Sequence, residues 1–580
     1  MALFPPRLVS LMSSSALALI LFGGVGLSNT AQASDKAQKQ LDAFAQVEKD
    51  YFKWHWLQSP ISATSDGIHT MEGRNLDAAL DDSSEKADKK AVAYLKTVRR
   101  QLTHLSLPKD NKIRENDRQI LIHSIDGQLL SLEKIQPQIH NPDFYTQIAT
   151  SALDSLISRD FAPLETRMQD VIAREYAFKK FFQSAAKKLD QVPEIFIEVS
   201  KENLNGAESF VKKDVPLAFA SVKNEELQRE LQSSTKSALK AIEKYRNHVE
   251  SLKASGTYVL GRKNLEALLA SDLTTTPIET LIKQGEEQLQ KDQASLKEAQ
   301  KAISPNNLAE AFATVRKDHV ASDQLLNLAA EQLRETQDFV ISHHIASLPN
   351  KSFPKVTPTL PFERSLITAA MSWPGPFEAE AKTSYYYVTA PDPKDPPFKQ
   401  QEDLEDLNTS TMLNITVHEG MPGHFVQGLY LHSHPEWSLT RKEGNSYATA
   451  EGWAHYTEQM MLDEGFHATQ PEYRLMVATD ALLRDCRFLA SLKMHTGKMS
   501  LKEATDLMQN ACYQSPSMAY KEARRGTVDP GYYSYLLGKI QIQQYRDEEK
   551  KRLGDHFSLQ AFHDHILASG LIPMSLIAEE

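Results

Sequence analysis

The sequence predicts a large, mainly α-helical protein with a small β element. Between Ser34 and Asn350 glycine is scarce, and prolines fall between periodic apolar segments rather than inside them. Ten prolines between positions 349 and 397 then interrupt the helical pattern, which resumes near Leu404. We therefore expect a helical N-terminal region (34–350) and a helical C-terminal region (351–580), arranged as two lobes around a central cleft.

The composition is that of an ordinary globular protein. Hydrophobic residues make up 41% and charged residues 24% of the 580 positions, which is enough apolar content for a large core. The formal net charge is -11, and acidic and basic residues are mixed along the chain. No basic stripe is present that would bind phosphates, so nucleic acid is not an expected partner.

The first 33 residues have the pattern of a signal peptide. Arg7 supplies a positive charge, residues 16–27 are apolar, and Ala31-Gln32-Ala33 matches the small-x-small pattern that signal peptidase recognises. The apolar run is shorter than the ~20 residues that span a bilayer. No cysteine stands at the cleavage point, which argues against a lipid anchor. We expect a periplasmic or secreted protein without stable membrane insertion; the alternative is an uncleaved N-terminal anchor.

One helix start in the N-terminal region is well marked. Thr276 is placed as the N-cap, Pro277 as the first helical residue and Glu279 as the partner in a capping box. Apolar residues from Ile278 onward then repeat with a helical period and give one apolar face.

Two features of the C-terminal region leave alternatives open. Residues 385–388 (Tyr-Tyr-Tyr-Val) predict a short strand, which either binds a peptide as an added strand or belongs to the core. Cys486 and Cys512 are the two cysteines of the chain, and an oxidising compartment would allow them to form one disulfide.

The chemistry centres on residues 417–427, Val-His-Glu-Gly-Met-Pro-Gly-His-Phe-Val-Gln. A His-Glu pair followed by a second histidine is the basis of the zincin site, in which the histidines bind Zn²⁺ and the glutamate acts as general base. In that motif the histidines are four residues apart, whereas His418 and His424 are six apart. In an unbroken helix their side chains would diverge by ~120°.

The residues between the two histidines offer a way to bring them together. Pro422 cannot donate a helical hydrogen bond, and Gly420 and Gly423 permit unusual backbone angles. We therefore expect the helix to bulge here, so that both imidazoles point at one metal ion. The competing interpretation is a pair of unrelated histidines around a helix break.

A third ligand is expected from the segment that starts at residue 451. Glu451, His455 and Glu458 fall on one face of a second helix, beside the apolar Trp453 and Tyr456. Two histidines and Glu451 would hold one Zn²⁺ per chain and leave a position open for water, as a catalytic site requires. Glu458 or His455 would orient the ligands; a second possible ligand set uses His455.

These motifs resemble those of a bacterial family of unknown function marked by His-Glu-x-x-Pro-Gly-His, which is similar to gluzincin-type zinc peptidases. The resemblance includes the Glu-Gly-Trp-Ala block at 451–458 and the segment from Arg525 to Lys539, which has a Tyr-x-x-Gly-Lys core and is followed by Arg546. It also includes the block around His563, and it covers most of residues 250–580. It implies the architecture of oligopeptidases and angiotensin-converting enzyme. One departure is Ser491-Leu-Lys-Met-His495, where many members carry Asp-x-Gly-x-His, and this leaves the role of His495 in doubt.

The resemblance implies an exported zinc metallohydrolase, most simply a peptidase in which Glu419 assists the attack of zinc-bound water. Tyr535 is the first candidate and Tyr532 the second for donating a hydrogen bond to the oxyanion, and Arg546 could bind a substrate carboxylate. The substrate would be a peptide or a small amide. The alternatives are a zinc hydrolase of another amide or ester, and a non-catalytic, metal-stabilised binding protein.

The signal peptide gives the first test. Because the small-x-small pattern ends at Ala33, the mature protein is expected to begin at Ser34. N-terminal sequencing of the periplasmic fraction measures this directly. A chain that still begins at Met1 and stays with the membranes would contradict it.

Overall fold

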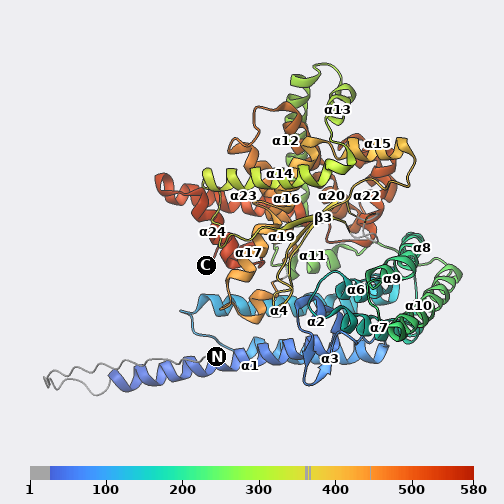
Figure 1. Cartoon of the computed structure of the whole chain (residues 1–580). Coiled ribbons are helices and arrows are strands. Elements are labelled where there is room, and N and C mark those ends of the chain that lie inside the picture. The colour runs from blue at the N-terminus through green and yellow to red at the C-terminus, as the bar shows by residue number, and fades with distance from the viewer. Residues whose placement is uncertain (1–25, 360–363, 365–366, 445) are drawn as a thin grey trace, which may run out of the picture.

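The computed structural model describes residues 26–359, 364, 367–444 and 446–580, and it is mainly helical as predicted (Figure 1). Most of the predicted signal peptide lies outside the described residues, and helix α1 (Gly26–Gln58) runs through the predicted cleavage point. In the described part, no helix combines the length and apolar character needed to cross a membrane.

Figure 1 shows helices α1 to α4 and α6 to α10 in the lower part of the molecule, and α12 to α14 together with the C-terminal helices above them. After α1, the helices up to residue 342 are α2 (Pro60–Asp66), α3 (Glu85–His104), α4 (Lys112–Leu130), α5 (Pro137–His140), α6 (Asp143–Ile157), α7 (Leu164–Lys188), α8 (Glu194–Ser209), α9 (Val215–Ala218), α10 (Glu225–Ser251), α11 (Arg262–Ser271), α12 (Ile278–Ile303), α13 (Leu308–Arg316) and α14 (Leu325–Ser342). Short π or 3₁₀ turns are η1 (Ser131–Ile135), η2 (Phe210–Asp214) and η3 (Ser322–Gln324).

The C-terminal helices include the two segments that carry the predicted metal ligands. They are α15 (Pro397–Asp406), α16 (Thr409–Glu419), α17 (His424–Ser433), α18 (Leu439–Lys442), α19 (Tyr447–Asp463), α20 (Pro471–His495), α21 (Leu501–Asn510), α22 (Pro516–Val528), α23 (Ser534–Leu553), η4 (Gly554–His556), α24 (Leu559–Ser569) and α25 (Met574–Ile577).

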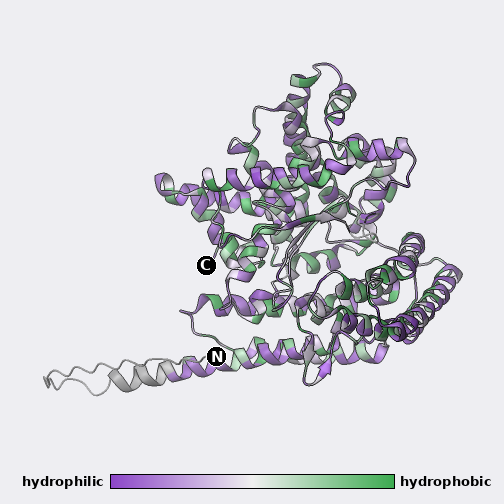
Figure 2. Ribbon diagram, in the orientation of Figure 1, coloured by the Kyte–Doolittle hydropathy of each residue, from purple (hydrophilic) through white to green (hydrophobic). Residues whose placement is uncertain are grey.

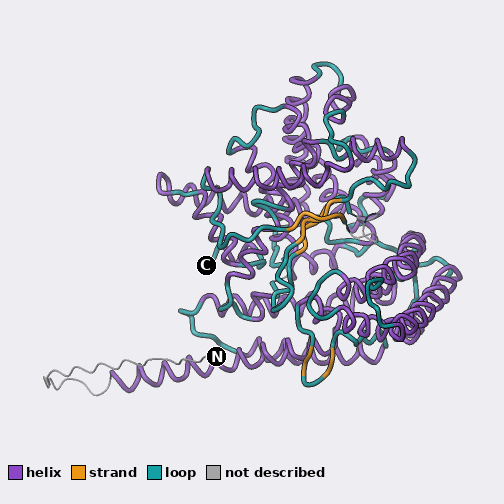
Figure 3. The backbone as a smooth tube through the Cα atoms, viewed as in Figure 1, coloured by secondary structure: helices purple, strands orange, loops and turns teal. Residues whose placement is uncertain are grey.

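The β structure is small (Figure 3). Strands β1 (Thr70–Met71) and β2 (Arg74–Asn75) form a hairpin, and β3 (Lys355–Pro358), β5 (Tyr385–Val388) and β4 (Ala369–Ser372) form a sheet in that order. The predicted strand at 385–388 is confirmed. It pairs in parallel with β3 and antiparallel with β4, so the interpretation of this strand as a peptide-binding edge is wrong. Among the described strands, the free edge on that side belongs to β4.

The cores show which helices pack together. Helices α1 to α4 surround one buried cluster that includes Phe44 and Leu121, and α6 to α10 surround another that includes Phe178 and Tyr245. In Figure 2, α10 is mostly hydrophilic with hydrophobic residues at intervals, as expected for a helix that buries one face. Helices α11 to α14 instead pack into the C-terminal cores, so these cores extend across residue 350.

The helix predicted from residue 278 is present, but its predicted cap is not. Ile278 is buried, whereas no side-chain capping bond forms at the start of α12. The helix begins one residue later than predicted, with Pro277 at the N-cap, and proline has neither a side-chain acceptor nor a backbone N–H for a capping box. The Glu279 carboxylate pairs with Arg262 and Lys498. The capping box was therefore the wrong interpretation of this carboxylate.

Cys486 and Cys512 form a disulfide, which the sequence left open. The bond joins α20 to the residues that follow α21, inside the core shared by α12, α13 and α20 to α22.

Helices α19 and α23 cross in close backbone contact. A Cβ atom on Gly538 would overlap the carbonyl oxygen of Ala448 and the Cα of Gly452. Glycine at both positions is therefore needed for this crossing, which brings Tyr535 on α23 next to Tyr447 on α19.

We predict that Gly538→Ala lowers the free energy of unfolding, because one added methyl group must push α23 away from α19. Overpacking of this kind costs roughly 1–3 kcal/mol, measurable by chemical denaturation. Gly206→Ala is the matched control: Gly206 lies inside α8 with open space around it, so alanine there should raise stability by about 0.5–1 kcal/mol. Equal stability of Gly538→Ala and the wild type would contradict the close-contact argument.

Candidate metal centre

The predicted distortion between the two histidines is confirmed, and it is larger than a bulge. Helix α16 ends at Glu419 and α17 begins at His424, so the turn at 420–423 divides the segment into two helices. A Cβ atom on Gly423 would overlap the carbonyl oxygen of His418, so only glycine fits this turn. The Gly423 N–H donates to the carbonyl of Val417 over 3.1 Å, which closes the turn.

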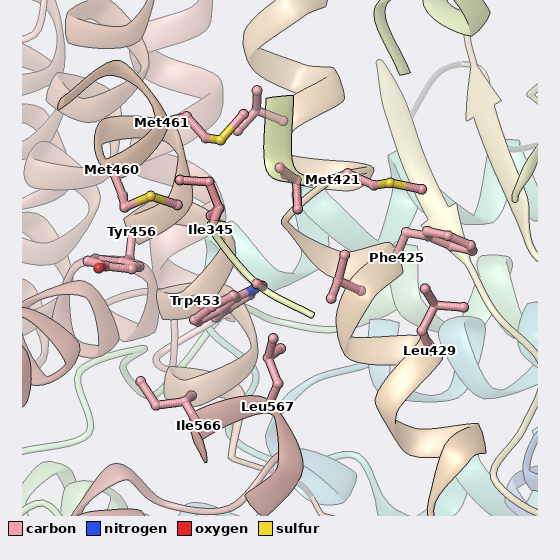
Figure 4. Packing of buried hydrophobic residues seen from close by; sticks show 14 of the residues in the cluster. Ile345, Met421, Phe425, Leu429, Trp453, Tyr456, Met460, Met461, Ile566 and Leu567 are labelled. Atoms are coloured by element: carbon pink, nitrogen blue, oxygen red, sulfur yellow. The ribbon is translucent and has the colours of Figure 1, made fainter. Parts of the chain in front are cut away.

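The turn is held from outside by α19. The indole N–H of Trp453 donates to the carbonyl of Pro422 over 2.9 Å, and Trp453 is fully buried. Met421 within the turn and Phe425 just after it are buried in the same hydrophobic cluster, which also contains Trp453 (Figure 4). The sharp change of chain direction therefore rests on packed side chains and on a satisfied backbone carbonyl.

This turn brings the three predicted ligands together. His418, His424 and Glu451 each offer a ligand atom, and these atoms lie within 4.8 Å of one another. The two imidazole rings are 4.9 Å apart between centroids and nearly perpendicular, at 89°. Oε2 of Glu451 lies 3.6 Å from Nε2 of His418 and 3.4 Å from Nε2 of His424. The unbroken helix would have kept these rings apart.

The other nitrogen of each ring is already in use. Nδ1 of His418 lies 2.7 Å from Oε1 of Glu458, and Nδ1 of His424 lies 2.9 Å from Oε1 of Gln427. An acceptor on Nδ1 fixes the tautomer in which Nε2 has its lone pair free, and both Nε2 atoms face Glu451.

The donor set fits a cation. Within the described residues, the buried Oε2 of Glu451 makes no hydrogen bond, although it lies between two imidazoles. A buried carboxylate oxygen without a hydrogen-bond partner needs a positive charge nearby. Two neutral Nε2 atoms and one carboxylate are a ligand set of catalytic zinc sites.

The charges within the group are strongly coupled. Burial lowers the pKa of His418, but the carboxylates of Glu451 and Glu458 outweigh it and raise that pKa to about 10. Burial raises the pKa of Glu451, but His424 and His418 outweigh it and hold the pKa of this carboxyl well below its usual range. Protons and a metal cation would therefore compete for the same imidazole nitrogens.

Glu458 contacts the Nδ1 atom of His418, which agrees with its predicted role of orienting a metal ligand. Its carboxylate receives a hydrogen bond from Asn414 and lies 3.3 Å from the guanidinium of Arg484. His455 lies 3.4 Å from Glu458, is fully buried and stands outside the three-residue group. Burial, followed by Lys539, lowers the pKa of His455 to about 3, so this ring is neutral.

Glu419 faces the same cavity as the metal group. Its Oε2 accepts a hydrogen bond of 2.7 Å from the backbone N–H of Met371, on the free edge of β4. The cavity has a volume of about 610 Å³, within the range of sites that hold small ligands. It is lined by residues 367–371, Trp373, Asn414, Ile415, His418, Glu419, His424, Tyr447, Ala450, Glu451, Asp480, Arg484, Arg487, Arg525 and Tyr535.

The two tyrosine candidates are in different places. Tyr535 lines the cavity, and its hydroxyl is 3.1 Å from that of Tyr447. Tyr532 is fully buried and donates its hydroxyl hydrogen bond to Glu522, so its proposed access to an oxyanion is wrong.

Three other residues with open roles lie away from the cavity lining. Nη1 of Arg546 donates to the hydroxyl of Tyr456, so its suggested contact with a substrate carboxylate is wrong. His495 is buried with Nε2 at 2.9 Å from the carbonyl of Gly526, and His563 lies between Tyr456 and the carbonyl of Ile345. These side chains support the helices behind the site.

Several groups around the metal centre were missed by the sequence reasoning. Gln427 could have been found, because it stands three residues after His424 on one helix and so faces the same side. Arg525 begins a segment that carries the family resemblance, but no role was predicted for it, and Arg487 stands in no motif. The N–H of Met371 is a backbone group, which no sequence pattern marks.

The chain is similar to a bacterial family and to solved structures. A family model described as "Bacterial protein of unknown function (DUF885)" matches residues 60–580. A structure from Shewanella oneidensis, "a putative lipoprotein of unknown function", is 24% identical with a TM-score of 0.76, over 92% of this chain and 99% of that one. A "putative lipoprotein" from Colwellia psychrerythraea is 18% identical with a TM-score of 0.77, over 94% and 98%. Among curated proteins, none matches the chain.

We predict that the purified protein holds about one zinc ion per chain. His418→Ala, His424→Ala and Glu451→Ala each remove one of three protein ligands, so each should lose most of the bound zinc. Metal analysis after dialysis measures the content. His563→Ala is the control, because this buried histidine lies outside the group. Full zinc content in any ligand variant would remove that residue from the set.

Proposed function

Since the chain belongs to the DUF885 family of bacterial proteins of unknown function, its activity has to be inferred from its own site, and we propose that it is an exported zinc-dependent hydrolase that cleaves peptide bonds. The observation that carries this proposal is the convergence of His418, His424 and Glu451 beside Glu419 in one cavity. A purely structural metal site would use all of its coordination positions on protein ligands and would have no need of a neighbouring base.

Zinc held by two histidines and a glutamate supplies Lewis-acid activation of a carbonyl group and of water. In the proposed reaction Glu419 takes a proton from the attacking water and returns it to the leaving amine. Glu419 directly follows the ligand His418 in the chain and lines the same cavity, which supports this role. The hydrogen bond from the backbone N–H of Met371 orients the carboxylate of Glu419.

Tyr535 is the proposed donor to the oxyanion that forms on the substrate carbonyl. Burial and then the nearby Glu451 raise the pKa of Tyr535, which keeps its hydroxyl protonated and able to donate. Tyr447 contacts this hydroxyl over 3.1 Å and limits its movement. A donor that is held in place before the reaction stabilises developing charge at low reorganisation cost.

The free edge of β4 favours a peptide over another amide or ester. The register places Ala370 and Ser372 opposite Tyr387 and Tyr385, and the N–H of Met371 points to the cavity side, where it meets Glu419. A substrate in extended conformation could lie along this edge and form backbone hydrogen bonds with it. An ester without peptide groups would gain nothing from such an edge.

Export is supported by independent features. The leader has the composition of a signal peptide, and the disulfide between Cys486 and Cys512 is a bond that persists in oxidising compartments. The similar solved structures are described as lipoproteins, a class of exported proteins.

We predict that Glu419→Gln keeps zinc but loses most peptide hydrolysis. The amide preserves the shape of the side chain and removes its basicity, and loss of a general base typically lowers the rate ~10²–10⁴-fold. Turnover of a peptide library by the zinc-loaded protein, together with metal analysis, measures both quantities. Wild-type turnover in Glu419→Gln would refute the proposed mechanism.

The companion variant is Tyr535→Phe, which should lower the rate by a smaller factor, on the order of 10²–10³, at unchanged zinc content. Tyr532→Phe is its control, because that hydroxyl is buried against Glu522. If the wild type hydrolyses simple esters or acylated amino acids and cleaves no peptide, the zinc chemistry stands and the peptidase assignment fails.

A further inference from the structure

The cavity wall next to the metal group carries three arginines. Arg484 and Arg487 come from α20 and Arg525 comes from α22. Arg484 is held by protein groups: its Nη1 donates to the carbonyl of Asp480 over 3.0 Å, and its Nη2 lies 3.3 Å from Glu458. Its buried Nε has no hydrogen-bond partner among the described residues. Asp480, the acidic residue on this wall, accepts from Asn414 over 2.7 Å.

Arg487 is held in a fixed position by two hydrogen bonds, and one nitrogen of its guanidinium group remains without an acceptor. Nε and Nη2 donate to the two carboxylate oxygens of Glu522 over 2.9 and 3.1 Å. Its guanidinium carbon lies 5.3 Å from the ring centre of Tyr532 and 5.5 Å from that of Tyr535. In the part of the chain that is described, Nη1 has no hydrogen-bond acceptor, although Arg487 lines the cavity.

Arg525 has even fewer partners. Its guanidinium donates no hydrogen bond to any described residue, and the nearest carboxylate oxygen, on Asp529, is 3.7 Å away. The side chain is 41% exposed and lies 5.3 Å from the ring centre of Tyr532, the same ring that contacts Arg487. Two guanidinium groups with unused donors therefore flank one buried ring at the cavity wall.

Two tyrosine side chains lie between Arg487 and the metal group. Tyr447 stands four residues before Glu451, on the same face of α19, and its hydroxyl contacts that of Tyr535. The ring of Tyr535 in turn contacts Arg487. The path from Glu451 to Arg487 thus passes through the two tyrosines.

We propose that Arg487 and Arg525 bind a carboxylate of the substrate, so that the enzyme selects peptides with a negative charge close to the cleaved bond. This inference rests on the proposed peptidase function. Guanidinium groups form strong, directional pairs with carboxylates, and unused donors inside a cavity are costly unless a ligand or water completes them. The carboxylate is either the C-terminal carboxylate of a short peptide or an acidic side chain.

The test compares matched substrates that differ in one charge. N-acetyl trialanine with a free C-terminal carboxylate is compared with its amide, and a tripeptide amide with a central glutamate is compared with its glutamine analogue. We expect kcat/KM to be roughly 10- to 100-fold higher for the charged member of one pair. The pair that shows the preference identifies the source of the carboxylate.

Arg525→Met should lower kcat/KM for the charged member much more than for the uncharged member, and so remove this preference. Arg525→Lys should retain part of it, because the charge remains without the planar fork. Arg524→Met is the matched control: the neighbouring Arg524 pairs with Glu202 outside the cavity, so this variant should behave as the wild type. Equal losses on charged and uncharged substrates in Arg525→Met would overturn the proposal, as would equal kcat/KM within both pairs for the wild type.

A binding measurement separates the two proposals. In the Glu419→Gln background, calorimetry compares the affinity for the charged and uncharged member of each pair, with and without Arg525→Met. Tighter binding of a charged peptide that depends on Arg525 supports the arginine site even if the wild type cleaves no peptide, an outcome in which only the peptidase function fails. Equal affinity for both members of both pairs overturns the arginine site, whatever the turnover.

Discussion

The close contact of the Gly423 backbone with the carbonyl of His418 is the constraint on which the site depends. It forces the chain to leave one helix and begin another within four residues, and this change of direction makes the two histidine rings converge. Any side chain at Gly423 would occupy the space of that carbonyl. The geometry of the candidate metal site is therefore determined by a backbone contact, and the ligand side chains follow from it.

Helix α19 connects this turn to the rest of the cavity. It supplies Glu451 to the ligand group, Glu458 to the back of His418, and the indole of Trp453 to the carbonyl of Pro422. The glycine crossing with α23 then brings Tyr535 to the same cavity. Because one helix contacts the ligands, the turn and the tyrosines, a shift of α19 would disturb all of them together.

The sequence was sufficient for local features and insufficient for those that depend on tertiary contacts. Helical periodicity and the proline-rich break predicted the mainly helical fold. The three aromatic residues before Val388 predicted a strand. The position of this strand in the middle of the sheet depends on partners that are distant in the chain. The Pro-Gly pair predicted the distortion before His424, since proline and glycine act on their own backbone. A binding role for Arg487 and Arg525 could not be predicted, because the sequence does not show which arginines have a carboxylate partner in the folded protein. The capping box at Glu279 failed because the helix begins one residue later than predicted, with Pro277 at the N-cap position.

The packing of α11 to α14 against the C-terminal helices limits how this protein can be rearranged in evolution. A gene fragment that encodes only residues 351–580 would produce a chain whose largest apolar faces have lost the helices that cover them. Such a fragment could not be transferred to another protein as an independent unit. Duplication, fusion and recombination are therefore expected to preserve the stretch from α11 to the C-terminus as one inherited piece.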